Sequence, residues 1–464
     1  MRVGALLLVV LAVCGAGARA ALREAFSWRQ LDFAWPSPAA KEHALATGAF
    51  RPEASVPVGL EVWGQRVFVT VPRWATGVPA SLTVFPVNAS SDSPVLSPYP
   101  DWASHNTSAP AWGQLPSRVV SPFRLRADSC GRLWVLDTGR ADVLGDAQQL
   151  APAALLVFDL RTDQLLRRYE VPRDQLMDSS FLVNLAVDVS PTGCEDTYAY
   201  LADMGSYALI VYSWAGNESW RVTHNYFLSH PLQGEFRVAG TRFQWPDGIF
   251  GLALSKANRY NHRTLYFHAF ASTSEFQVST EILQNKTRAL NSFHEFHLVG
   301  DRGPNTQSCA SFMDEESGIA FYTQVNLDAI TCWNSRTRPH YEPTTIGLVA
   351  QDNRTLVFPN DVKVDADGNV WVLTDRLALF LYSSLDPKDV NFRILTATVQ
   401  EAVNGTICDP AYSGPEPKLE NHPLESRFGG GSLCDRSAAT TPAAVAAALA
   451  PLLALALWGR RDAC

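Results

Sequence analysis

The 464-residue chain lacks an excess of basic residues, because 38 Lys and Arg are set against 46 Asp and Glu and the formal charge is −8. Such an acidic balance excludes a nucleic-acid polyanion as the predicted partner. The chain also lacks the G-x-S-x-G nucleophile elbow, the phosphate-binding loop and the dinucleotide fingerprint. These absences leave no cofactor to predict from a motif.

Metal-binding spacings are missing as well. The eight cysteines include no C-x-x-C or close Cys/His pairing, and His294 and His297 lack the i, i+4 spacing of a helical zinc pair. No metal site is predicted from these residues, and the cysteines are interpreted as disulfide partners in an oxidising compartment. The preferred pairs are Cys130–Cys194 and Cys309–Cys332, with Cys408–Cys434 as a less certain third.

Long apolar runs are scarce outside the two ends of the chain. The first run, 5–13, is too short to span a membrane. With Arg2 before it and Ala18-Arg19-Ala20 after it, this run predicts a signal peptide over 1–20, cleaved after Ala20. Six N-x-[ST] sequons agree with secretion and predict glycosylation: Asn88, Asn106, Asn217, Asn285, Asn353 and Asn404.

The second apolar run, 442–458, follows a polar linker over 405–441 and precedes Arg460 and Arg461. Two interpretations stay open. One is the removed hydrophobic tail of a lipid-anchor signal; the other is a short membrane span with arginines on the cytoplasmic side. Either would hold an extracellular protein at the cell surface.

A repeated hairpin is the strongest positive signal. The stretch 126–139, RADSCGRLWVLDTG, returns as VDADGNVWVLT at 364–374, and weaker copies lie between and before them. The equivalent aromatic positions are spaced by 66, 66, 66, 56 and 49 residues: Phe68, Trp134, Tyr200, Tyr266, Tyr322 and Trp371. Each interval holds four short strands, the content of a propeller blade. The prediction is an all-β, six-bladed β-propeller over 56–404, with 21–55 joining the ring. The alternative is a β-sandwich whose hairpins resemble one another by chance.

Several motifs resemble one family. VTVPRWATGVPASL (69–82), SCGRLWVLDTG (129–139), DGIFGLALS (247–255), TCWN (331–334) and Asn360-Asp361 occur in the order typical of the Yellow and major royal jelly proteins of insects. The resemblance implies a six-bladed propeller and roles in pigmentation and cuticle. Some relatives convert dopachrome, some bind biogenic amines in a central pocket, and others are nutritional or structural, so the resemblance leaves the activity open.

Candidate ligand residues follow from propeller geometry, in which inner strands converge at the mouth of the channel. Residues at the start of those strands are Asn184, Asp247, Asn360 and Asp361; Asp137 and Asn326 end or follow second strands, and Phe250 offers an aromatic wall. For each Asp or Asn the alternative is an ordinary turn or strand-end cap.

Three functions remain open. The first is a tautomerase of a catecholic quinone such as dopachrome, with Asp247 or Asp361 as general acid and base. The second, ranked level with it, is a protein that binds catechol-derived ligands or acts in extracellular matrix without turnover. The third, well behind, is a metal-dependent hydrolase with oxygen ligands from Asn184, Asp247, Asn360 and Glu61.

Overall fold

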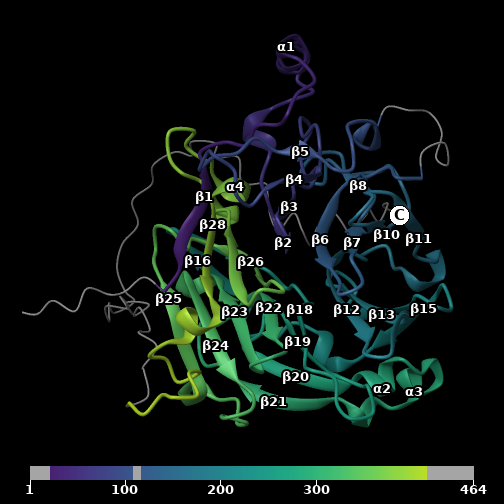
Figure 1. Cartoon of the computed structure of the whole chain (residues 1–464), viewed down its shortest axis with the longest axis vertical. Coiled ribbons are helices and arrows are strands. Elements are labelled where there is room, and N and C mark those ends of the chain that lie inside the picture. Colours follow the sequence, from purple (N-terminus) through teal and green to yellow (C-terminus); the bar gives the residue numbers. More distant parts are fainter. Residues whose placement is uncertain (1–20, 108–115, 415–464) are drawn as a thin grey trace, which may run out of the picture.

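A computed structural model describes residues 21–107 and 116–414. Six four-stranded antiparallel sheets are arranged around a central axis, as Figure 1 shows. The first strand of each blade lies against the first strands of its two neighbours, so the six first strands form a closed inner ring. The predicted all-β, six-bladed propeller is confirmed.

The blades follow chain order, each from its inner to its outer strand. Blade 1 has β2 (Gly59–Trp63), β3 (Arg66–Thr70), β4 (Leu82–Pro86) and β5 (Ser97–Pro98); blade 2 has β6 (Pro122–Ala127), β7 (Arg132–Asp137), β10 (Ala154–Asp159) and β11 (Leu165–Glu170); blade 3 has β12 (Leu182–Ser190), β13 (Gly193–Asp203), β14 (Ala208–Ser213) and β15 (Glu218–Thr223). Blade 4 has β18 (Ile249–Leu254), β19 (Thr264–Ala269), β20 (Ser274–Ser279) and β21 (His297–Asp301); blade 5 has β22 (Ser308–Asp314), β23 (Ile319–Gln324), β24 (Ala329–Asn334) and β25 (Ile346–Gln351); blade 6 has β26 (Pro359–Val364), β27 (Asn369–Thr374), β28 (Phe392–Thr398) and β1 (Arg23–Trp28).

The other strands and the α-helices lie outside the regular four-strand order of the blades. They are the hairpins β8 (Arg140–Ala141) with β9 (Gln148–Gln149) and β16 (Glu235–Val238) with β17 (Thr241–Gln244), and the helices α1 (Pro38–Thr47), α2 (Thr280–Leu283), α3 (Lys286–Asn291), α4 (Leu377–Tyr382) and α5 (Val399–Val403). In Figure 1, α1 projects from the edge of the ring above blade 1. No helix in the described ranges is long and apolar enough to cross a membrane.

The N-terminal strand closes the ring. β1 pairs antiparallel with β28, so a strand from the start of the chain completes the last blade. Phe26 of β1 is buried against Phe85 of blade 1, with the two ring centroids 4.9 Å apart. The last blade is thereby completed by the start of the chain, and Phe26 with Phe85 and the hydrogen bond from the Ser27 N–H to the carbonyl oxygen of Asp92 hold it against blade 1.

The repeated motif is a turn held by its aspartate. In blade 2, Asp128 Oδ1 accepts from the backbone N–H of Cys130 and Arg132, while Oδ2 accepts from Trp134 Nε1 at 2.7 Å. In blade 6, Asp365 makes the matching bonds to the turn backbone and to Trp371 Nε1, also at 2.7 Å. The glycine three residues after each aspartate has φ near +75°, a conformation that glycine adopts at little cost. All six aromatic positions used to count the repeats lie on the second strands of their blades.

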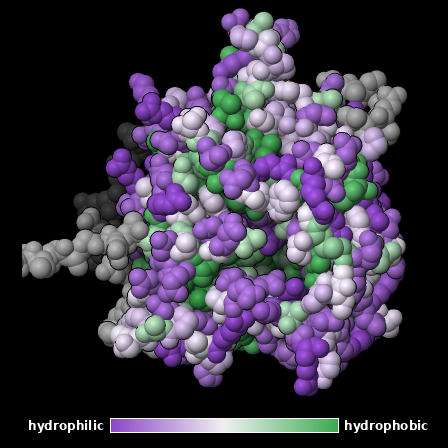
Figure 2. Space-filling view, viewed as in Figure 1, coloured by the Kyte–Doolittle hydropathy of each residue, from purple (hydrophilic) through white to green (hydrophobic). Residues whose placement is uncertain are grey.

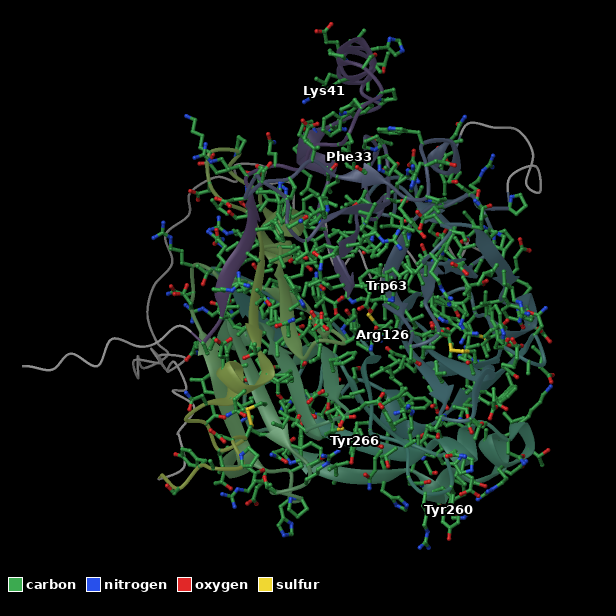
Figure 3. All side chains as sticks on the ribbon, viewed as in Figure 1. Phe33, Lys41, Trp63, Arg126, Tyr260 and Tyr266 are labelled. Atoms are coloured by element: carbon green, nitrogen blue, oxygen red, sulfur yellow. A yellow bond between two sulfur atoms is a disulfide. The ribbon has the colours of Figure 1, made fainter. Side chains whose placement is uncertain are left out.

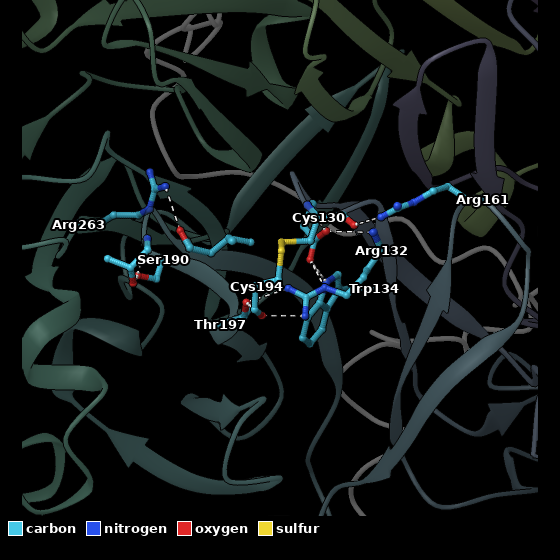
Figure 4. The surroundings of a disulfide bond; sticks show 11 residues. Cys130, Arg132, Trp134, Arg161, Ser190, Cys194, Thr197 and Arg263 are labelled. Atoms are coloured by element: carbon cyan, nitrogen blue, oxygen red, sulfur yellow. Dashed lines mark hydrogen bonds and ion pairs between the residues drawn. A yellow bond between two sulfur atoms is a disulfide. The ribbon is translucent and has the colours of Figure 1, made fainter.

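One predicted disulfide is confirmed. Cys130 and Cys194 are bonded, with their Cα atoms 5.9 Å apart, and join the turns of blades 2 and 3. Figure 4 shows Arg132 beside this bond, where its guanidinium donates to the carbonyl oxygen of Cys194 and to Thr197. Neighbouring turns of consecutive blades therefore lie close enough to be cross-linked.

The other two predicted pairs are wrong, because Cys332 is bonded to Cys408 and Cys309 is a buried free thiol. Cys309 lies on β22 and Cys332 on β24, with β23 between them. Two strand spacings amount to about 10 Å, whereas bonded cysteines need Cα atoms within about 7 Å. Cys408 reaches Cys332 because the segment after α5 turns back over blade 5, where α5 lies against β25.

The predictions about processing concern the two ends of the chain and the glycosylation sequons. The signal peptide over 1–20, Cys434 and the tail over 442–458 lie outside the described residues. All six sequon asparagines are exposed. Glycosylation at these positions stays a prediction.

Candidate functional site

A small aromatic chamber lies at the end of the channel where the inner strands begin. Its rings come from the starts of inner strands and from the loops that surround them, and they are Trp74, Phe123, Phe181, Trp245, Phe250, Phe270 and Phe358. Phe123 and Phe250 pack edge to face with centroids 5.9 Å apart, as do Phe250 and Phe270 at 5.5 Å. The chamber encloses about 20 Å³, which is room for one water molecule.

Asp247 is the acidic residue of this chamber. It sits just before β18, and only 5% of its surface is exposed. No described residue forms a hydrogen bond or ion pair with its carboxylate. Burial alone raises the pKa of Asp247 to about 7, since an apolar surrounding penalises the charged form. A lone buried carboxylate among aromatic rings is suited to a cationic partner.

A buried guanidinium lies next to three residues that line the chamber, Phe123, Phe250 and Asn360. Arg124 of β6 donates to the carbonyl oxygen and to the side-chain Oδ1 of Asn360, both at 2.7 Å, and to the carbonyl oxygen of Val58. Its guanidinium carbon lies 5.0 Å from the ring centroid of Phe123 and 5.6 Å from that of Phe250. These cation–π contacts place a fixed positive charge beneath the rings.

Behind Asn360 lies a second buried acid. Asp375 accepts from Asn360 Nδ2 and, at 3.1 Å, from the backbone N–H of Leu377. Burial raises the pKa of Asp375 to about 8, even though Asn360, Leu377 and the nearby Arg124 favour its charged form. The side chains of Arg124, Asn360 and Asp375 form one hydrogen-bonded chain.

Three of the predicted site residues come together here, namely Asp247, Phe250 and Asn360. Asp361 does not join them. Its carboxylate accepts from the backbone N–H of Leu60 and from Lys363 Nζ, both at 2.9 Å, and lies 3.7 Å from Arg124 Nε. A carboxylate held between two cations and a backbone donor serves to join blades 1 and 6, and it is poorly placed to act as a base.

The other predicted residues have local structural contacts. Asn184 donates to the carbonyl oxygen of Phe250 at 2.8 Å and lines a separate cavity farther along the channel. Asp137 accepts from the backbone N–H of Val120, Ser121 and Gly139, which is the pattern of a strand-end cap. Asn326 binds the hairpin β16–β17 through the backbone of Arg237 and Glu235.

Three of the four residues assigned to a metal-dependent hydrolase, Asn184, Asn360 and Glu61, already use their side-chain oxygen atoms, whereas the carboxylate of Asp247 has no partner among the described residues. Asn360 accepts from Arg124, and Glu61 forms an ion pair with Arg126 at 3.1 Å. A guanidinium therefore occupies the position beside Asn360 that the hydrolase hypothesis gave to a cation. Within residues 21–107 and 116–414, no cluster of three His, Cys, Asp or Glu side chains could hold a metal ion.

The opposite part of the channel is lined by charged side chains as well as by apolar ones. Arg126 lies 4.5 Å from the ring centroid of Phe312, and Figure 3 shows Arg126 near the middle of the ring. Lys363 lines the same small cavity of about 40 Å³. On the face drawn in Figure 2, hydrophilic residues dominate the surface and hydrophobic ones show mostly in the hollows between them. The channel thus combines an aromatic chamber with an opposite part lined by paired charges, since Arg126 is bound to Glu61 and Lys363 to Asp361.

Sequence reasoning missed Arg124, Asp375 and most of the chamber rings. Arg124 follows Phe123 in an ordinary strand pattern, and Asp375 follows a strand end, where acids commonly cap turns. The aromatic residues are distributed over loops of several blades, and no local spacing connects them. The ring of blades brings them together.

Comparisons with known proteins agree with the motifs. Residues 120–408 match the family described as major royal jelly protein. The chain is 45% identical over 400 residues to Protein yellow of Drosophila yakuba, which covers 85% of this chain and 72% of that protein. Protein yellow of Drosophila guanche is 44% identical over 416 residues, covering 88% of this chain and 72% of that one.

Among solved structures, a structural genomics protein of unknown function from Bacteroides thetaiotaomicron aligns over 81% of this chain and 76% of its own. Its TM-score is 0.44 at 10% identity, and a match at that level carries no information on function. The sequence similarities are of a different strength, since they extend over most of the propeller. The chain belongs to the Yellow and major royal jelly protein family.

Proposed function

We propose that this protein acts outside the cell in insect pigmentation by binding catechol-derived small molecules in the aromatic chamber. The observation that carries the proposal is Asp247, a buried carboxylate that lies among aromatic rings and has no hydrogen-bond or ion-pair partner in residues 21–107 and 116–414. An aromatic amine would place its ring against those side chains and its ammonium group beside the carboxylate. Phenolic hydroxyl groups would find polar partners around Asn360.

Binding requires the chamber to widen, because 20 Å³ is far less than the volume of a catechol ring. Met204 and Leu377 are the flexible aliphatic residues of its lining, and both lie outside the strands, Met204 in the loop after β13 and Leu377 at the start of α4. Movement of these two side chains opens the chamber without disturbing the inner strands. The ligand would then occupy the widened cavity at the centre of the chamber.

Tautomerisation is the second candidate, and the pKa of Asp247 favours it. A group with a pKa of about 7 can both accept and donate a proton at neutral pH. In dopachrome conversion, Asp247 would remove a proton from ring carbon and an acid would return one to oxygen. Asp247 is the acid–base residue in this scheme, and Asp361 is not, because Lys363 and Leu60 engage its carboxylate.

Calorimetric titration with dopamine tests the binding proposal. We expect affinity to increase from pH 6 to pH 8, since the carboxylate must be charged to pair with an ammonium group. Asp247→Asn should weaken binding roughly 10- to 100-fold and remove the pH dependence. Asp137→Asn, whose carboxylate caps a strand away from the chamber, is the matched control. Equal affinity for wild type and Asp247→Asn would refute the proposed site.

Turnover is measured separately by following the decay of dopachrome. A rate above the uncatalysed one that falls on Asp247→Asn would establish the tautomerase. Tight dopamine binding together with an uncatalysed rate of decay would assign the protein to the binding class.

A further inference from the structure

A second cavity, larger than the chamber, lies between blades 2 and 3. It encloses about 360 Å³, which is within the range of small-molecule sites. The loop between β7 and β10 forms one wall, and the connection from β11 to β12 forms the other. We call it the blade 2–3 pocket. Phe181 lines both this pocket and the aromatic chamber, so one ring separates the two.

The charge of this pocket is positive, in contrast to the chain as a whole. Among the residues that the structure describes, its lining includes Arg140 and Arg173 and no acidic side chain. Arg140 donates to Gln149 Oε1 at 2.8 Å and, at 3.3 Å, to the carbonyl oxygen of Asp178, and these two bonds hold its guanidinium at the rim. Arg173 is less constrained by the protein, since 82% of its side chain is exposed.

Two acids near the pocket, Asp203 and Asp178, offset part of this positive charge, but neither lines the pocket. Asp203 is buried and already bound by Arg221 at 3.2 Å and by Ser180 at 2.6 Å. Asp178 pairs with Arg173 at 3.3 Å, but both side chains are almost fully exposed, so the pair is weak. The pKa of Arg140 is lowered, mainly by burial; Asp203 and Asp178 raise it and the nearby Arg173 lowers it. The two guanidinium groups therefore act on the same space.

The rest of the lining is mostly apolar. Val171, Phe181 and Leu182 are buried at its base, and Leu150, Leu176 and Met177 add to the walls. An apolar base with two guanidinium groups at the rim matches a flat hydrophobic molecule that carries one anionic group.

We propose that the blade 2–3 pocket is a second ligand site, and that it binds aromatic carboxylates. The carboxylate is held by Arg140 and Arg173, and the ring lies over Val171 and Phe181. This site does not depend on the function proposed for the chamber. If both assignments hold, the two sites sort aromatic ligands by charge, cations to Asp247 and anions to the arginines.

The test uses the full chain and three related probes: indole-2-carboxylate, its neutral amide and the cation tryptamine. By calorimetry, the carboxylate should bind, and the amide should bind at least about fivefold more weakly. Arg173→Gln should weaken carboxylate binding roughly three- to tenfold, and Arg173→Lys should keep most of it. Asp178→Asn, which frees Arg173, should leave affinity unchanged or tighten it.

Two further variants locate the site. Ala153→Trp fills the pocket and should abolish carboxylate binding, with thermal unfolding as the check on folding. Asp247→Asn should leave carboxylate binding unchanged while it weakens tryptamine binding, so the two sites can fail independently. Equal binding of carboxylate and amide, or loss of carboxylate binding in Asp247→Asn but not in Arg173→Gln, would overturn the assignment.

Discussion

At the scale of single residues, the turn aspartates show why the repeat is visible in the sequence. Asp365 satisfies two backbone donors of its turn and the indole N–H of Trp371 with one side chain. Asp provides two acceptor oxygens within reach of both, whereas the amide nitrogen of Asn could not accept from the indole, and glycine is favoured three residues later by its positive φ. One turn therefore requires Asp, Gly and Trp at fixed spacing, and its recurrence in another blade makes the motif visible in the sequence.

Asp365→Ala should lower the free energy of unfolding by roughly 2–4 kcal/mol, because it leaves an indole donor and turn amides unsatisfied. Urea unfolding followed by tryptophan fluorescence measures this loss. Asp367→Ala is the matched control, as Asp367 lies in the same turn with its side chain exposed. Similar losses for both variants would contradict this role of Asp365.

Asp247 gives a prediction for stability against pH. The pKa of this carboxyl is about 7 in the folded protein and near 4 when unfolded, so the folded state holds the extra proton between those values. Stability should therefore decrease as pH rises from about 4 to about 7. Asp247→Asn removes this penalty and should stabilise the protein at pH 8 by roughly 2–4 kcal/mol. Thermal unfolding of both proteins at pH 5 and pH 8 tests the claim, and equal differences at the two pH values would contradict it.

Some residues in and around the chamber could be predicted from the sequence and others could not. Asp247, Phe250 and Asn360 could be predicted because each begins an inner strand, and those strand ends converge in a propeller. Arg124 could not be predicted, since its role depends on Asn360 of another blade, 236 residues away in the chain. Asp137 and Asn326 resemble site residues in the sequence, but their contacts are those of caps and loop anchors.

At the scale of elements, the strands of each blade are predictable because they repeat, whereas cross-links between elements are not. The pairing Cys130–Cys194 follows from equivalent turns in consecutive blades. The pairing Cys332–Cys408 depends on the path taken by the chain after α5, a segment that belongs to no repeat. A peptide map without reduction should find these two bonds and Cys309 as a thiol.

Cys309 should react with an alkylating reagent only after unfolding, because it is buried on an inner strand. Unfolding also removes the effect of burial, which raises the pKa of this thiol to about 12 and keeps it unreactive. A bond from Cys408 to Cys434, or alkylation of Cys309 in the native protein, would contradict the arrangement described above.

Ring closure by β1 gives the second prediction about elements. Phe26→Ala should lower the free energy of unfolding by roughly 3–5 kcal/mol, since it leaves a cavity where β1 meets Phe85 of blade 1. Arg23→Ala, on the same strand but exposed, should change it by less than about 0.5 kcal/mol. Urea unfolding compares the two variants. Equal stability would mean that β1 does not close the ring.

At the scale of the whole molecule, the propeller brings loops from all parts of the chain to one end of a channel. Residues of the chamber span Trp74 to Leu377, and the inner strands fix their starting points. Repeat spacing was sufficient to predict the number of blades. It could not predict that a guanidinium would lie between Asn360 and the chamber rings, because that depends on side-chain packing between blades.

The most direct measurement is a crystal structure of the protein with dopamine. We predict that the ammonium group lies within hydrogen-bond distance of Asp247, with the catechol ring among the aromatic side chains and with Met204 and Leu377 displaced. Dopamine bound only elsewhere, with the chamber unchanged at the size of one water molecule, would contradict the account.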